Sequence, residues 1–152
     1  MVGESDIDIY LDQLSKKANL DEEIRSISNE QPFLASFLHI DRHSLLSEEE
    51  YGFLWFMVVA IYRSFEEKNG PLAQIDASNI EDKEEKIWGL LNDSKERTFR
   101  GKLDIFFEMC PEEDLLAFIE DSLTDDEDTI ITNAGREFVF VPAATLLFCL
   151  SL

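Results

Sequence analysis

The chain has 152 residues, and its 33 Asp and Glu against 13 Lys and Arg give a formal charge of −20 at pH 7. Apolar residues make up 45% of the sequence, so the chain can build a hydrophobic core and is not an acidic disordered tail. Its length suits a single domain, residues 1–152, that folds without a disulfide or a metal ion. The negative charge argues against direct binding of nucleic acid, because phosphates would meet a surface of like charge.

Two uncharged apolar runs, residues 51–62 and 138–152, are only 12 and 15 residues long. A helix that crosses a bilayer needs about 20 apolar residues, so we expect no membrane insertion. The acidic N-terminal segment lacks the basic and apolar regions of a secretory signal, which predicts a cytoplasmic protein. In that compartment Cys110 and Cys149 are expected to remain reduced thiols.

Helical periodicity dominates the N-terminal part of the chain. Apolar residues spaced three, four and seven apart predict a first helix over residues 7–18. Asp21 is expected to start only a short turn, in which Ile24 and Ile27 face inward. Pro32 fits the first turn of a second helix, where its missing N–H costs little.

The clearest helix signal is a capping box, in which the Ser47 hydroxyl accepts from the Glu50 amide and the Glu50 carboxylate reaches back. The helix that starts there should end at Asn69-Gly70-Pro71, a strong terminator. Residues 53–62 are apolar on every side, which is typical of a helix enclosed by others. We therefore expect residues 48–68 to form a buried central helix.

Similar apolar spacing predicts three more helices, over residues 79–91, 95–109 and 111–123. The last stretch allows two interpretations. Residues 137–141 form a short strand, or one helix runs from about residue 133 with a bend at Pro142. The helix is favoured, because a lone strand would have nothing to pair with. The predicted fold class is all-α: a compact, irregular bundle of six to seven helices around the helix at about 48–68.

Charge is segregated along the chain, since residues 103–135 contain eleven acidic residues and no Lys or Arg. This stretch predicts a surface that docks a basic partner protein, because complementary charge raises the rate of encounter. The candidate docking residues are Glu112, Glu113, Asp114, Asp121, Asp125, Asp126, Glu127 and Asp128. The alternative is that the charge only keeps the protein dispersed and monomeric. Residues 121–128 lack the central Gly of a calcium-binding loop, so no specific calcium site is expected.

A basic island precedes the acidic stretch, and its members are Lys95, Arg97, Arg100 and Lys102. On a helix Arg97 and Arg100 share a face, as do Lys95 and Lys102. The favoured interpretation is internal neutralisation by the acidic helix that follows. The alternative is a site for an anion or an acidic partner. The segregation also allows a homo-oligomer, in which the island of one subunit meets the acidic face of another.

His39 and His43, with Asp41 between them, have a spacing that places both rings on one face of a helix, which makes them a weak candidate for a metal site. Two His ligands are too few, and Ile40 occupies the position of the Glu in the usual catalytic motif. Cys110 is surrounded by acidic residues, which raise a thiol pKa and argue against a reactive nucleophile. We therefore expect neither a metal ion nor a cofactor.

Aromatic residues offer the last candidate site, a ligand pocket lined by Trp55, Phe56, Tyr62 and Trp88. The favoured interpretation places them in the core, as is usual for aromatic residues at helical spacing. The chain has no Gly-x-Ser-x-Gly elbow and no glycine-rich phosphate loop. The leading hypothesis is therefore a non-catalytic interaction protein, such as an inhibitor, chaperone or adaptor. The alternatives are a small-molecule-binding helical domain with an aromatic pocket and a metal-dependent enzyme centred on His39 and His43.

Overall fold

The computed structural model describes residues 3, 7, 20–39, 46–124 and 133–151. Its helices are α2 (Leu20–Glu30), α3 (Pro32–His39), α5 (Glu48–Asn69), α6 (Ala77–Asp93), α7 (Phe99–Lys102), α8 (Asp104–Met109), α9 (Glu113–Thr124) and α10 (Asn133–Ser151). No strand occurs in these ranges, so the predicted all-α class is confirmed. Of the first predicted helix only Ile7 is described, and the remainder lies outside these ranges.

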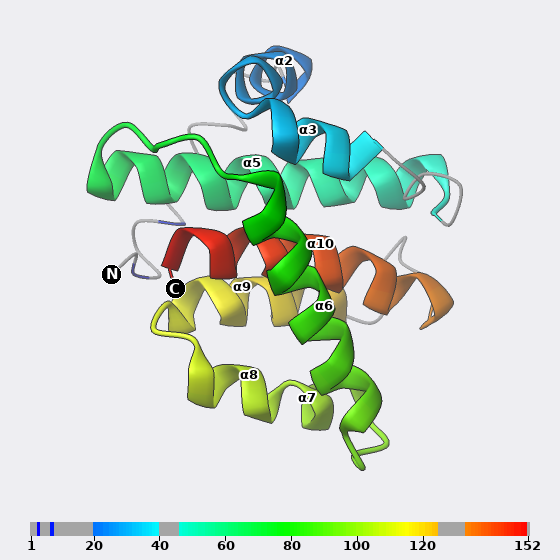
Figure 1. The fold of residues 1–152 in the computed structure, drawn as a ribbon. Coiled ribbons are helices and arrows are strands. Elements are labelled where there is room, and N and C mark those ends of the chain that lie inside the picture. The colour runs from blue at the N-terminus through cyan, green and yellow to red at the C-terminus, as the bar shows by residue number, and fades with distance from the viewer. Residues whose placement is uncertain (1–2, 4–6, 8–19, 40–45, 125–132, 152) are drawn as a thin grey trace.

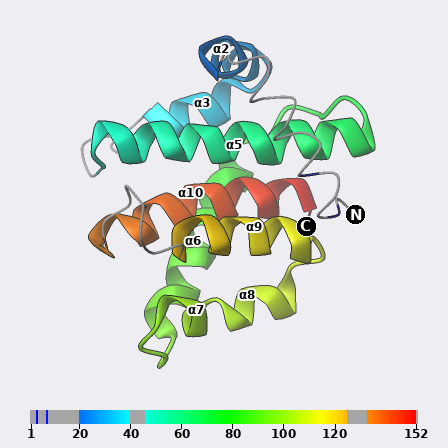
Figure 2. The ribbon, with the colours of Figure 1, turned by 180° about the vertical axis from the view of Figure 1, so that it is seen from behind.

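The helices are stacked in layers between two short end pieces (Figure 1). α2 and α3 lie at one end, α7 and α8 lie at the other, and α5, α10 and α9 lie between them. α10 packs against α5, α6 and α9. α6 crosses α10 on the side that faces the viewer in Figure 1, whereas α9 lies nearer to the viewer in Figure 2.

The long helix α5 begins and ends where its local signals predict. The Ser47 Oγ accepts a hydrogen bond from the Glu50 N–H at 3.1 Å, and the Ser47 N–H donates to Glu50 Oε1 at 3.1 Å. At the other end, Gly70 adopts a φ of 83° and its N–H donates to the Glu66 carbonyl at 2.7 Å. Only glycine adopts such a φ without strain, so the helix stops there. The residues from Met57 to Tyr62 are buried on all sides of the helix.

The last helix, α10, settles the choice between a strand and a helix in favour of the helix. It runs without interruption through Pro142, which has no N–H to donate to the Phe138 carbonyl. Every residue from Val139 to Phe148 is buried, so α10 is enclosed all round, as α5 is over part of its length. Within the helix the Thr145 hydroxyl donates to the Val141 carbonyl at 2.7 Å.

Two predicted elements are wrong. Residues 20–30 form a helix of 11 residues rather than a short turn, and three acidic residues in its first turn favour it through the helix dipole. The predicted helix over residues 95–109 is broken, because residues 94–98 are not helical. There the Ser94 hydroxyl accepts from the Glu96 N–H at 3.2 Å, and Thr98 Oγ1 caps α7 by accepting from the Gly101 N–H at 3.0 Å. Such local side-chain bonds compete with continued helix.

Candidate interaction surfaces

The predicted acidic surface is only partly exposed. Glu113 and Asp121 lie exposed on α9, and Asp114 is half-buried beside them. Glu112 is 6% exposed, so its carboxylate cannot be part of a docking surface. The four other predicted docking residues, Asp125, Asp126, Glu127 and Asp128, lie outside the described residues.

The basic island does not lie on one helix, so its predicted shared faces are wrong. Arg100 Nη1 lies 2.7 Å from Glu120 Oε1, and Lys102 Nζ lies 3.2 Å from Glu137 Oε1. Arg100 is thus neutralised by the acidic helix α9, as the favoured interpretation expected, whereas Lys102 pairs with α10 instead. Lys95 and Arg97 are exposed in the linker 94–98 and form no ion pair with any residue that the structure describes.

Negative charge is concentrated around Glu120. Burial raises the pKa of this carboxyl, Arg100 lowers it, and the charges of Asp121 and Asp104 raise it again, so the net shift is upward. Arg100 Nη2 also lies 3.6 Å from Asp121 Oδ1. Arg100 of α7 therefore pairs with two carboxylates of α9.

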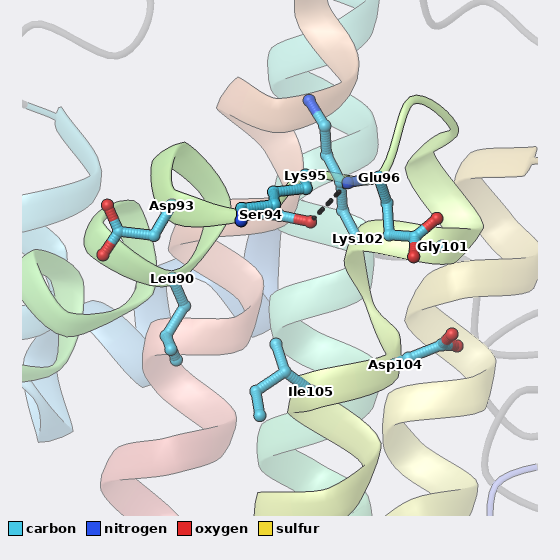
Figure 3. Close-up of a pocket in the computed structure, with 9 residues that line it drawn as sticks. All are labelled: Leu90, Asp93, Ser94, Lys95, Glu96, Gly101, Lys102, Asp104 and Ile105. Carbon is cyan, nitrogen blue, oxygen red and sulfur yellow. Dashed lines mark hydrogen bonds between the residues drawn. The ribbon is translucent and has the colours of Figure 1, made fainter.

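A pocket of about 340 Å³ lies between the end of α6 and the start of α8 (Figure 3). Its apolar wall is made by Leu90 and Ile105. Lys95 and Lys102 also line it, and the ammonium of Lys102 is held by Glu137. No aromatic side chain lines this pocket, so it is not the predicted aromatic pocket.

The four candidate pocket aromatics are spread through the molecule. Trp55 and Tyr62 are buried in the hydrophobic core, and Phe56 and Trp88 pack against it with part of their surface exposed. The Trp88 ring meets Phe138 of α10 edge-on, with ring centroids 5.7 Å apart. This ring contact joins α6 to α10.

The candidate metal ligand His39 is engaged by aromatic neighbours. Its Nδ1 lies 2.8 Å from Tyr51 Oη, and its ring centroid lies 5.7 Å from that of Trp55. Asp41 and His43 lie outside the described residues. Within the described part of the chain, no three His, Cys, Asp or Glu side chains are grouped so as to hold a metal ion.

Both cysteines are free thiols with raised pKa values. Burial is the main cause, and it raises the pKa of Cys149 to about 11. For Cys110 burial also dominates, and the charges of Glu112 and Glu113 raise the pKa further. A thiol that stays protonated at neutral pH is a poor nucleophile.

Sequence reasoning missed a buried polar network around Gln31, which lies between α2 and α3 and is completely buried. Its Nε2 donates to the Ala73 carbonyl at 2.9 Å and to Tyr62 Oη at 3.2 Å. Its Oε1 accepts from the Ile75 N–H at 2.8 Å. The amide thus joins the α2–α3 junction to α5 and to the loop before α6. No local pattern marks Gln31, because all of these partners are distant in sequence.

Arg63 of α5 is the second group that sequence reasoning missed. Its guanidinium lies 2.7 Å from Glu23, 3.3 Å from Glu30 and 2.7 Å from Glu66. It also donates to the Ser26 hydroxyl at 2.8 Å, and its side chain is only 14% exposed. The spacing of Arg63 and Glu66 is visible in the sequence, but the contacts with α2 come from the fold. The ion pairs and the hydrogen bond of Arg63 thus link α5 to α2.

No helix among the described residues combines the length and the apolar character that a membrane span requires. No family model, no curated protein and no solved structure matches this chain. We therefore infer its function from its own surfaces.

Proposed function

We propose that the protein is a non-catalytic interaction protein that docks a basic partner protein on the acidic surface of α9, here called the α9 surface and represented by Glu113 and Asp121. One observation carries the proposal: both side chains are exposed, on a stretch, residues 103–124, with seven acidic residues and no basic one. Arg100 reaches Asp121 only at 3.6 Å, and the Asp121 side chain remains 72% exposed. Internal pairing therefore leaves this surface negative.

Such a surface acts mainly on the rate and the specificity of association. Complementary charge steers a basic partner into contact, and like charge repels acidic competitors. At physiological ionic strength screening limits this attraction to about 8 Å, so binding depends on salt. The free thiols Cys110 and Cys149 are compatible with an inhibitor, chaperone or adaptor that acts in the reducing cytoplasm.

The test is a pull-down from native lysate with the tagged chain, eluted with a salt gradient and read by mass spectrometry. A stoichiometric basic protein released at moderate salt is then purified, and its affinity is measured by titration calorimetry. The variant Glu113→Lys/Asp121→Lys should weaken this affinity by about tenfold or more.

A matched control separates local docking from net charge. The variant Glu81→Lys/Glu85→Lys changes two exposed carboxylates on α6 and gives the same formal charge of −16. Because α6 and α9 lie on opposite sides of α10, this control should bind the partner as the wild type does. The proposal is contradicted if both variants lose affinity equally, or if no stoichiometric basic partner is found. The negative charge would then serve only to keep the protein dispersed.

A further inference from the structure

The linker 94–98, α7 and α8 form one outer edge of the molecule (Figure 1). The charged residues along this edge change from basic in the linker to acidic on α8. We call it the 94–109 edge. Lys95 and Arg97 are exposed at its first end and have no ion-pair partner among the described residues. The side chain of Glu96, which lies between them in the sequence, points towards Gly101 (Figure 3). Its Oε2 lies 3.1 Å from the position that a Cβ atom on Gly101 would occupy. Glu96 is itself exposed, so this end carries two cations and one carboxylate and remains net positive.

The second end of the 94–109 edge is acidic. Asp104 and Glu108 are exposed one turn apart on α8, and neither forms an ion pair within the described ranges. Ile105 lies between Asp104 and Glu108 in the sequence of α8 and is 37% exposed. With Phe33 it is one of the two large apolar side chains that are exposed in the described part of the chain. Ile105 and the half-buried Leu90 form the wall of the pocket beside Lys95. The edge therefore carries basic residues in the linker and, on α8, two acidic residues with one exposed apolar side chain between them.

We propose that the 94–109 edge is a self-association surface on which a second copy of this chain docks about a two-fold axis. In such a dimer the same patch of both copies is in contact. Lys95 and Arg97 of one copy then face Asp104 and Glu108 of the other, and the reverse contact forms at the same time. Ile105 of each copy lies beside Asp104 within this contact. We assign the edge to a second copy of the chain because the edge is complementary to itself: it carries both the basic and the acidic residues that such a contact pairs.

The dimer is expected to be weak. Pairs of exposed charges contribute little each, and a small contact of this kind is typical of transient association. Each copy also carries a formal charge of −20, so the two repel at long range. At about 0.15 M salt this repulsion is largely screened beyond roughly 8 Å, whereas charges in direct contact at the edge are screened less.

Sedimentation equilibrium on the full chain tests the proposal at about 0.15 M salt, with protein from about 10 μM to about 1 mM. The wild type should show a reversible equilibrium between monomer and dimer. The variants Lys95→Glu/Arg97→Glu and Asp104→Lys/Glu108→Lys should each weaken dimerisation by about tenfold or more, because like charges then oppose each other. An equimolar mixture of the two variants should dimerise at least as tightly as the wild type, since every contact again joins opposite charges.

Two controls hold the net charge constant. Arg25→Glu/Lys86→Glu has the same formal charge of −24 as the first variant, and Glu81→Lys/Glu85→Lys has the same −16 as the second. These exposed residues of α2 and α6 lie outside the edge, so both controls should dimerise as the wild type does. The proposal is overturned if the wild type is a monomer at every concentration. This would also be the result if the edge bound a different, acidic protein instead of a second copy. Equal effects of variants and controls, or no heterodimer in the mixture, also overturn it. Glu113 and Asp121, which represent the α9 surface, are unchanged in all of these variants, so the loss of dimerisation and the loss of docking are separate outcomes.

Discussion

Replacing the buried Gln31 with Met should lower the free energy of unfolding by about 2–4 kcal/mol. The Gln31 amide donates to Ala73 and Tyr62 and accepts from the Ile75 N–H, at 2.9, 3.2 and 2.8 Å. Met has a similar length and volume and a flexible chain. The substitution therefore leaves little cavity and removes mainly the hydrogen bonds.

The largest contribution comes from the Ile75 N–H, because Ile75 is buried and its donor loses its partner. An unsatisfied buried donor costs about 1–3 kcal/mol. A typical hydrogen bond contributes about 0.5–1.5 kcal/mol. We expect the bonds to Ala73 and Tyr62 to lie at the low end of this range. Ala73 is exposed, so its carbonyl can bind water, and Tyr62 Oη retains its bond to Glu30 at 3.2 Å. The loss is a large part of a total stability of about 5–15 kcal/mol.

Urea unfolding followed by circular dichroism measures this loss, and the melting temperature should fall by about 4–16 °C. Gln74→Met is the matched control, because Gln74 is exposed in the same loop. The control should change stability by less than about 0.5 kcal/mol. If the two variants unfold at the same urea concentration, the buried amide does not stabilise the fold and the reasoning is refuted.

The remaining predictions concern single groups. Ser47→Ala removes the N-cap of α5 and should cost about 1 kcal/mol in urea unfolding; an unchanged midpoint contradicts the cap. Gly52→Ala should raise stability by about 0.5–1 kcal/mol in calorimetry, because its Cβ meets open space in the helix. Gly101→Ala should give no such gain, because its Cβ would lie 2.9 Å from Thr98 Oγ1, and equal shifts for the two glycines would disprove this. Because the folded state keeps the Cys149 proton up to a pKa of about 11, the unfolding free energy falls as pH rises from about 9 to about 11. Iodoacetamide should alkylate the native thiol slowly at about pH 8, and fast alkylation there would show that Cys149 is not shielded.

Local signals predicted much of the fold. The capping box from Ser47 to Glu50 and the stop at Gly70 depend on residues within one helical turn, and the structure confirms both. The apolar character of residues 53–62 on every side correctly indicated a buried helix. These features are readable from the sequence because helix caps and periodicity are properties of neighbouring residues.

Where two local patterns compete, the sequence leaves the outcome open. The helix over residues 95–109 follows from periodicity, but the polar linker has side chains that bond to its own backbone, and Thr98 starts a new helix. Residues 137–141 were compatible with a strand or a helix, and burial against α5, α6 and α9 placed them in α10.

The pairing of polar groups was decided by the tertiary structure alone. Arg100 meets Glu120 from 20 residues away, and Lys102 meets Glu137 from 35 residues away, so the sequence did not indicate which cations remain exposed. The partners of Gln31 lie 31 to 44 residues along the chain. Composition determined that the surface is acidic, whereas the fold decided which carboxylates face the solvent. The physical reason is that a cap or a periodic face depends on residues within a turn, while burial and ion pairing depend on which distant segments pack together.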